Sequence, residues 1–197
     1  MPANTPIFGF PYPLGTDPVS QGDNDIRALA EDVETVVAKT GLWLVKTQAV
    51  GATPVPSVVV TNAFNADYDN YRIVWSGGSG SAVDWIYMTL NNASGLSYGY
   101  GASFVQYGGT PGTPNSSGDS KWWVGIYGST FSISLDVYQP YATSTTSFTS
   151  QSASNAYSVV SGGYNSNSAS HTDFTFTAAG VGTSFTGGTI RVYGYNN

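Results

Sequence analysis

The residue types that most often carry out catalysis are sparse in this sequence. Its 197 residues include 12 acidic side chains, a single histidine (His171) and no cysteine. A glycosidase needs two carboxylates that flank the scissile bond, and Asp84 and Asp136 are the pair to test first because both lie in or beside predicted strands. Neither belongs to a recognised motif, and no serine has the sequence context of a nucleophile elbow. We therefore predict that the protein is not an enzyme and uses no cofactor.

Metal binding has one candidate segment. Asp67 and Asp69 place two carboxylates on the same side of an extended chain, and hard oxygen ligands at this spacing could bind Ca²⁺. No glycine-bearing loop with a following glutamate completes a calcium-binding pattern, however. One histidine and no cysteine exclude a multi-histidine or thiolate site within one subunit. We interpret the two aspartates as part of a turn leading into a strand at Tyr71, and predict no bound metal.

Large aromatic residues are the other candidates for ligand contact. Trp85, Trp122, Trp123 and Tyr127 could offer flat platforms to sugar rings, but large aromatics also dominate the area buried in cores and subunit interfaces. In a strand, the adjacent Trp122 and Trp123 point to opposite faces. One of them then needs a second layer, a neighbouring subunit or a ligand. We take Trp85, Trp122 and Trp123 as the candidate glycan contacts.

Composition restricts the partners. Only 9% of the residues are charged and the net charge is −6, whereas nucleic acid and anionic membranes must be met by clustered cations. No stretch approaches the ~20 apolar residues of a membrane-spanning helix, and the first residues lack the basic and apolar regions of a signal peptide. We therefore predict neither nucleic-acid binding nor membrane insertion. Glycine (24 residues), tyrosine (14) and long runs of Ser, Thr and Asn replace charge, which favours a weakly charged all-β protein.

Residues 1–22 form a proline-rich arm. Proline lacks the amide donor and biases the residue before it towards extended geometry, so the five prolines of this segment predict neither a helix nor a central strand. The arm also carries apolar residues that a disordered linker has little reason to hold. It is either a strap across its own domain or an anchor that docks on another protein. The candidate anchoring residues are Phe8, Phe10, Tyr12, Leu14 and Val19.

Residues 23–40 contain the one convincing helix. The segment opens with Asp23, Asn24 and Asp25, all good N-caps, and Gly41 follows its last turn. A lone helix of this length is marginal in water, so its apolar seam must pack on the β domain of the same chain or self-associate, most plausibly as a trimeric coiled coil. The seam, with the spacing of coiled-coil core positions, consists of Ile26, Leu29, Val33 and Val36.

Residues 41–197 carry β signals, and short apolar or alternating runs are separated by Gly, Pro, Asn and Ser clusters. In 131–138, Phe131, Ile133, Leu135 and Val137 alternate with more polar residues, which predicts a strand with one buried and one solvent face. We predict an antiparallel sandwich of jelly-roll type. Arg72 and Arg191 lie inside apolar strands, so each is expected to meet an aspartate or a subunit interface. The Ser/Thr/Asn-rich segment 143–172 is interpreted as exposed edge or tip strands. The predicted strands are Leu42–Val50, Ser57–Asn62, Tyr71–Ser76, Trp85–Asn91, Tyr98–Tyr107, Lys121–Tyr127, Phe131–Tyr138, Ala156–Val160, His171–Thr177 and Thr189–Tyr195.

Three segments of the chain carry longer motifs. The first is Phe10-Pro-Tyr-Pro with Thr16-Asp-Pro-Val, Gly22 and Ile26-Arg-Ala-Leu-Ala30; the second is Gly41-Leu-Trp-Leu-Val-Lys-Thr47 with Phe64-Asn-Ala-Asp-Tyr-Asp-Asn-Tyr-Arg72; the third is Gly187-Gly-Thr-Ile-Arg-Val-Tyr-Gly-Tyr195. In this order, the three segments resemble virion proteins of tailed bacteriophages. The middle of the chain, roughly 76–170, is similar to them only in texture.

The resemblance implies a homotrimeric appendage on the virion surface, attached by its arm and helix and displaying its β domain outward. Proteins of this kind are tail fibres, minor tail proteins or receptor-binding proteins, and similar modules serve as head fibres or capsid decoration proteins. The chain has no long shaft between helix and β domain, which favours a compact knob. We expect a tail-fibre or receptor-binding component that contacts host-surface glycans, with capsid decoration as the alternative. The implied partners are further copies of the chain and tail or major capsid proteins.

Overall fold

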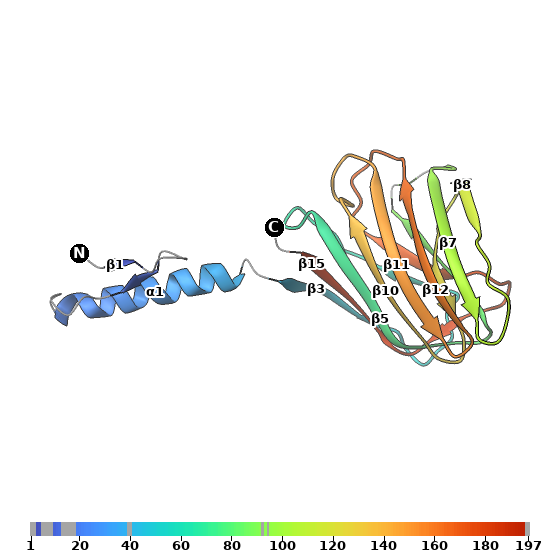
Figure 1. Ribbon diagram of the computed structural model, residues 1–197, viewed down its shortest axis with the longest axis horizontal. Helices are drawn as coiled ribbons and strands as arrows, with labels where there is room; N and C mark the ends of the chain where they lie inside the picture. Colours follow the sequence, from blue (N-terminus) through green and yellow to red (C-terminus); the bar gives the residue numbers. More distant parts are fainter. Residues whose placement is uncertain are drawn as a thin grey trace. The chain divides into compact units, whose positions relative to one another are not determined.

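The protein consists of two units that are described separately. The computed structural model describes residues 3–4, 10–12, 19–38, 41–91, 93 and 95–195. The N-terminal unit extends to Gly41, and the second unit runs from Leu42 to Tyr195. Figure 1 shows the helix of the first unit and the strands of the second.

The described residues of the N-terminal unit form a two-residue strand pair and one helix. Strand β1 (Ala3–Asn4) pairs antiparallel with β2 (Pro11–Tyr12), and helix α1 spans Val19–Ala38. Two sequence predictions are wrong here. The helix begins four residues before the expected caps, so Asp23, Asn24 and Asp25 lie inside it, and Val19 belongs to the helix rather than to the arm. The run of three strong capping residues is therefore not the helix start, because residues 19–22 add one more helical turn before it.

Helix α1 leaves part of its apolar seam in contact with solvent. The side chain of Ile26 is 63% exposed and that of Val33 is 41% exposed, while Leu29 is partly buried. On the same helix, Arg27 and Glu31 form an ion pair at 3.9 Å, with both side chains exposed. The seam residue Val36 lies in α1, but its side chain falls outside the described residues, as do the predicted anchors Phe8 and Leu14 and the side chains of Tyr12 and Val19. The anchor Phe10 is partly buried.

The second unit is a sandwich of two antiparallel sheets. Within the described residues, the larger sheet has nine strands, eight in one series and β14 (Phe185–Thr186) paired with β5. Figure 1 shows most of these strands side by side. The series runs β3 (Leu42–Ala49), β15 (Thr189–Tyr195), β5 (Asn70–Gly80), β10 (Phe131–Tyr138), β11 (Thr146–Ser154), β12 (Tyr157–Asn165), β7 (Tyr98–Gln106) and β8 (Asn115–Asp119).

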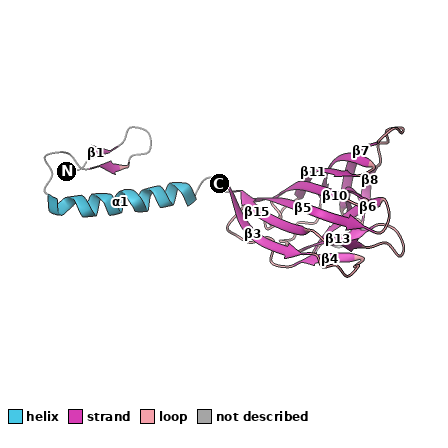
Figure 2. Cartoon of the chain, turned by 90° about the horizontal axis from the view of Figure 1, so that it is seen from below, coloured by secondary structure: helices cyan, strands magenta, loops and turns pink. Residues whose placement is uncertain are grey.

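The smaller sheet lies against one face of the larger one (Figure 2). Its order is β4 (Ser57–Val60), β13 (Phe174–Ala178), β6 (Asp84–Leu90) and β9 (Trp122–Tyr127). Apolar residues at every second position of the strands form the core between the sheets, because successive side chains point to opposite faces. The predicted inward face of β10 is confirmed, since Phe131, Ile133, Leu135 and Val137 are all buried. Trp75 of β5 lies among Phe131, Phe176 and Phe185, with ring centroids 4.9–5.6 Å apart.

Each of the ten predicted strands overlaps an observed one. Among the described residues, five observed strands were not predicted: β8, β11 and the two-residue β14 in the second unit, and β1 and β2 in the N-terminal unit. Interpreting segment 143–172 as edge or tip strands is wrong, because β11 and β12 lie inside the larger sheet with neighbours on both sides. Their inward positions include Ser150, Ser152 and Ser161, all buried.

The buried serines of β11 satisfy the free edge of β9. Strand β9 is the last strand of the smaller sheet, and unpaired backbone groups at a buried edge are costly. The hydroxyl of Ser150 donates to the carbonyl of Val124 at 2.6 Å, and the hydroxyl of Ser152 accepts from the amide of Ile126 at 3.0 Å. Ser161 contacts the Ser150 hydroxyl at 2.6 Å. The hydroxyl groups of one sheet therefore complete the backbone hydrogen bonding of the other.

Candidate functional site

The candidate site is the face of the larger sheet that points away from the smaller one, here called the outer face. Its residues alternate with the core residues of the same strands. The strand registers set one row straight across it, here called the central row, in which each residue is paired with the next. The central row consists of Arg72, Asp136, Thr149, Gly162, Gly101 and Asn115.

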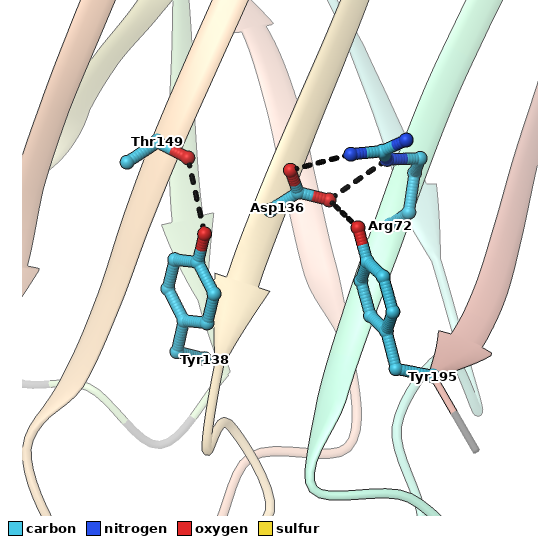
Figure 3. Close-up of polar contacts among 5 residues, drawn as sticks. All are labelled: Arg72, Asp136, Tyr138, Thr149 and Tyr195. Atoms are coloured by element: carbon cyan, nitrogen blue, oxygen red, sulfur yellow. Dashed lines mark hydrogen bonds and ion pairs between the residues drawn. The ribbon is translucent and has the colours of Figure 1, made fainter. Parts of the chain in front are cut away.

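One end of the central row is a charged cluster (Figure 3). Arg72 donates from Nε and from a terminal nitrogen to the two oxygens of Asp136, each at 2.8 Å, which is the strong bidentate geometry. The hydroxyl of Tyr195 donates to the same carboxylate at 2.6 Å, and the Arg72 guanidinium lies 5.6 Å from the Tyr195 ring centroid. The expectation of an aspartate partner is thus confirmed for Arg72. Arg191 instead contacts the hydroxyl of Ser76 at 3.5 Å.

These contacts shift the pKa values of all three groups. Burial alone would raise the pKa of Asp136, but hydrogen bonds from Arg72 and Tyr195 and the guanidinium charge outweigh it, so that pKa is lowered. The hydrogen bond to Asp136 raises the pKa of Arg72. Burial, followed by the bond to the carboxylate, raises the pKa of Tyr195 to about 12. At neutral pH, Asp136 is therefore an ionised hydrogen-bond acceptor, already paired, rather than a proton donor.

Two exposed tyrosines flank the central row on one side. Tyr138 and Tyr164 both pair with Ser147, one from each neighbouring strand, and are 37% and 45% exposed. The hydroxyl of Tyr138 lies 3.4 Å from the hydroxyl of Thr149, as Figure 3 shows. The Tyr164 ring covers Gly99, since a Cβ at that glycine would lie 2.6 Å from a ring carbon. Each ring is thus placed by a contact with the neighbouring strand.

The outer face is hollowed by three open depressions, and Val160 lines all of them. One of about 260 Å³ lies beside Arg72, Asp136 and Thr149. A second, of about 510 Å³, is bordered by Ser134 and Gln151. The third, of about 550 Å³, lies over Gly101 and Gly162. Their walls carry mostly hydroxyl, amide and small apolar groups.

Two of the three predicted glycan contacts, Trp122 and Trp123, are buried, and Trp85 is partly buried. Trp122 is fully buried in the core, 4.6 Å from Phe148 between ring centroids, and its indole N–H donates to the carbonyl of Tyr164. Trp123 is 3% exposed and packs against Trp85 at 4.0 Å. The adjacent tryptophans do face opposite ways, but β7 and β12 of the same chain supply the second layer, with Phe104 and Tyr157 around the partly buried Trp85.

The remaining candidates are separated. Asp84 lies in β6 of the smaller sheet and Asp136 in β10 of the larger one, so the pair to test first for glycosidase chemistry is divided between sheets. Asp67 accepts a hydrogen bond from the side chain of Asn65 and donates its own amide back to it, a local turn like the one predicted. Among the described residues, no group of three or more acidic or histidine side chains could hold a metal ion.

His171 is buried and lies outside the strand that was predicted for His171–Thr177. Strand β13 begins only at Phe174, and the Nδ1–H of His171 donates to the carbonyl of Asn91. Its Nε2 is buried without a hydrogen-bond partner among the described residues. Burial lowers its pKa, and the bond to Asn91 only partly offsets this. His171 is therefore a neutral structural residue that links the segments before β13 and after β6.

Sequence reasoning identified one end of this site and missed the rest. The alternation of β10 already places Asp136 and Tyr138 on the solvent side. Gln151, Tyr164 and the glycine pair were missed because they lie in strands whose serine-rich or glycine-rich composition hides the period of two. Only strand pairing brings them into one row.

Comparisons with known proteins leave the site to be interpreted from its own geometry. No protein-family model matches the chain, and no curated sequence matches it. In the part of the chain that the structure describes, no helix is both long enough and apolar enough to cross a membrane.

Proposed function

We propose that the protein is a homotrimeric surface appendage of a tailed-phage virion, attached by its N-terminal arm and displaying the β-sandwich to host-surface glycans. The observation that carries the proposal is the exposed apolar seam of α1, with Ile26 at 63% and Val33 at 41% exposure, in a unit separate from the sandwich. Such a seam is unfavourable in water unless further copies of the helix cover it. A trimeric coiled coil buries it and places three sandwiches on one stalk.

The sandwich supports a display role. Its antiparallel strands cross repeatedly between the two sheets, for example from β5 to β6 and from β9 to β10, as the strands of a jelly roll do, and we assign it to that type. Its outer face is weakly charged and rich in hydroxyl groups. Three copies of a weakly binding face would combine into strong attachment through avidity.

Capsid decoration is the second candidate. It is favoured by the shallowness of the depressions on the outer face, the largest about 550 Å³ and all open to solvent, since a chemically quiet exterior needs no deep pocket. In this version the arm holds shell subunits and the sandwich covers the capsid.

The test is immunolabelling of intact virions with an antibody against residues 42–195, viewed by electron microscopy. Label at the tail tip is the expected result. Label distributed over the head would replace the receptor-binding assignment by capsid decoration. Virions that carry no label, although the purified protein binds the antibody, would overturn the virion assignment altogether.

A further inference from the structure

We propose that the central row is the floor of a binding site for an extended, uncharged polysaccharide chain that lies across the strands of the larger sheet. The proposal rests on the proposed function, because it gives the displayed sandwich its glycan site. It also assigns glycan contact to residues other than Trp85, Trp122 and Trp123.

The central row forms a continuous track. Neighbouring strands lie about 4.8 Å apart, so six paired residues from Arg72 to Asn115 span on the order of 24 Å. Two adjacent members, Gly162 and Gly101, are directly paired and carry no side chain. A Cβ at Gly101 would meet no atom within 4 Å, so the space above it is open. The floor of the depression is thus backbone, which allows a ligand to approach closely.

The side chains along the track rise on both sides of this floor. Tyr164 lies on one side and Val160 on the other, and Val160 is 58% exposed. Tyr138 and Tyr164 lie two strands apart, about 10 Å, so successive units of one chain can contact both rings. An aromatic ring offers a flat apolar surface with a polar end, which matches the apolar face and hydroxyl rim of a sugar ring.

The charges and hydrogen-bonding groups select a neutral ligand. Arg72 and Asp136 neutralise one another through the bidentate pair, and the positions flanking the row carry hydroxyl, amide or apolar side chains such as Ser134, Gln151 and Val160. Hydroxyl and amide groups both donate and accept hydrogen bonds, as sugar hydroxyls do. A peptide that adds a strand needs a free sheet edge, but β10, β11, β12 and β7 are paired on both sides.

The test is binding of the full-length protein to a printed array of neutral and anionic oligosaccharides, followed by titration calorimetry with the best neutral oligosaccharide. We expect Tyr164→Ala to weaken binding about tenfold, from the loss of one stacking contact. Gly101→Val is the sharper variant, because valine suits a strand and fills the floor without a clash. We expect it to abolish measurable binding while the urea midpoint stays unchanged or rises.

Two substitutions serve as matched controls. Tyr141→Ala removes a tyrosine of similar exposure (38%) from the loop after β10, where it lines a separate depression. Gly118→Val adds the same side chain near the end of β8, where the nearest atom to a Cβ lies 4.0 Å away. Both should bind like the unchanged protein.

Three outcomes overturn the inference. If the unchanged protein binds only anionic oligosaccharides, the ligand class is wrong. If Gly101→Val and Tyr164→Ala bind neutral glycans as tightly as the unchanged protein, the site lies elsewhere while the glycan-binding function stands. If nothing on the array is bound, there is no such site, and immunolabelling of virions decides separately whether the protein is an appendage.

Discussion

At the scale of single residues, the Arg72–Asp136–Tyr195 cluster fixes the edge of the candidate site. Asp136→Asn removes the charge that holds the guanidinium and weakens the bond from Tyr195. Because Arg72 is about two-fifths exposed, solvent screens the pair, and we expect a loss of about 1 kcal/mol in unfolding free energy. Urea denaturation at low and high salt measures this. A stabilised variant, or a difference that salt leaves unchanged, would contradict the ion-pair account.

The buried His171 predicts how stability depends on pH. Burial lowers its pKa in the folded state, so below the unfolded value of about 6.5 the unfolded chain binds more protons than the folded one. The contribution of His171 to the unfolding free energy is therefore fully present above about pH 6.5 and is lost as the pH drops below it. The lowered pKa of Asp136 acts in the same direction, but only below about pH 4.

His171→Asn separates the two contributions, because an asparagine amide can still donate to the Asn91 carbonyl but does not titrate. Urea unfolding of both proteins at pH 7.5 and pH 5 is the measurement. We expect the loss of stability between these pH values to be much smaller in the variant. Equal losses would assign the pH dependence to other groups.

At the scale of elements, we expect the largest loss of unfolding free energy from a single substitution at the serine hydroxyls between β11 and β9. Ser150→Ala leaves the buried carbonyl of Val124 without its donor and takes a partner from Ser161. An unsatisfied buried polar group costs about 1–3 kcal/mol. Ser158→Ala, on the exposed face of β12, is the control and should change stability by less than about 0.5 kcal/mol. Similar values for the two variants in urea would show that these hydroxyl bonds contribute nothing.

The same serines show why some strands of the sandwich could be predicted from the sequence and others could not. Strands with apolar alternation, such as β10, were found with their bounds and inward faces. Strand β11 was missed because its inward positions are Ser150, Ser152 and Phe148, and local patterns give no reason to bury a serine. The reason is the backbone edge of β9, which is distant in sequence. The candidate site beyond Asp136 and Tyr138 was missed for the same reason, since its row depends on the register of five neighbouring strand pairs.

At the scale of the whole molecule, the exposed seam of α1 predicts the oligomeric state. Replacing both Leu29 and Val33 with Asp puts six charges into the core of a trimer, so we expect a monomeric mass by light scattering and an unchanged β-sheet circular dichroism signal. Thr35→Asp, at an exposed helix position away from the seam, should remain trimeric. An unchanged mass in the double variant would overturn the coiled coil.

The place of β3 in the sandwich has a mechanical consequence. The connection from α1 enters the sandwich at Leu42, the first residue of β3, and within the described part of the chain β3 lies at the edge of the larger sheet with β15 as its one ladder partner. A pull along β3 loads its whole ladder to β15, from Leu42–Tyr195 to Ala49–Thr189, in shear. The hydrogen bonds then share the force and must break together rather than one after another. A pull along β3 must therefore reach a much larger force to separate β3 from β15 than a pull that opens the same ladder from one end.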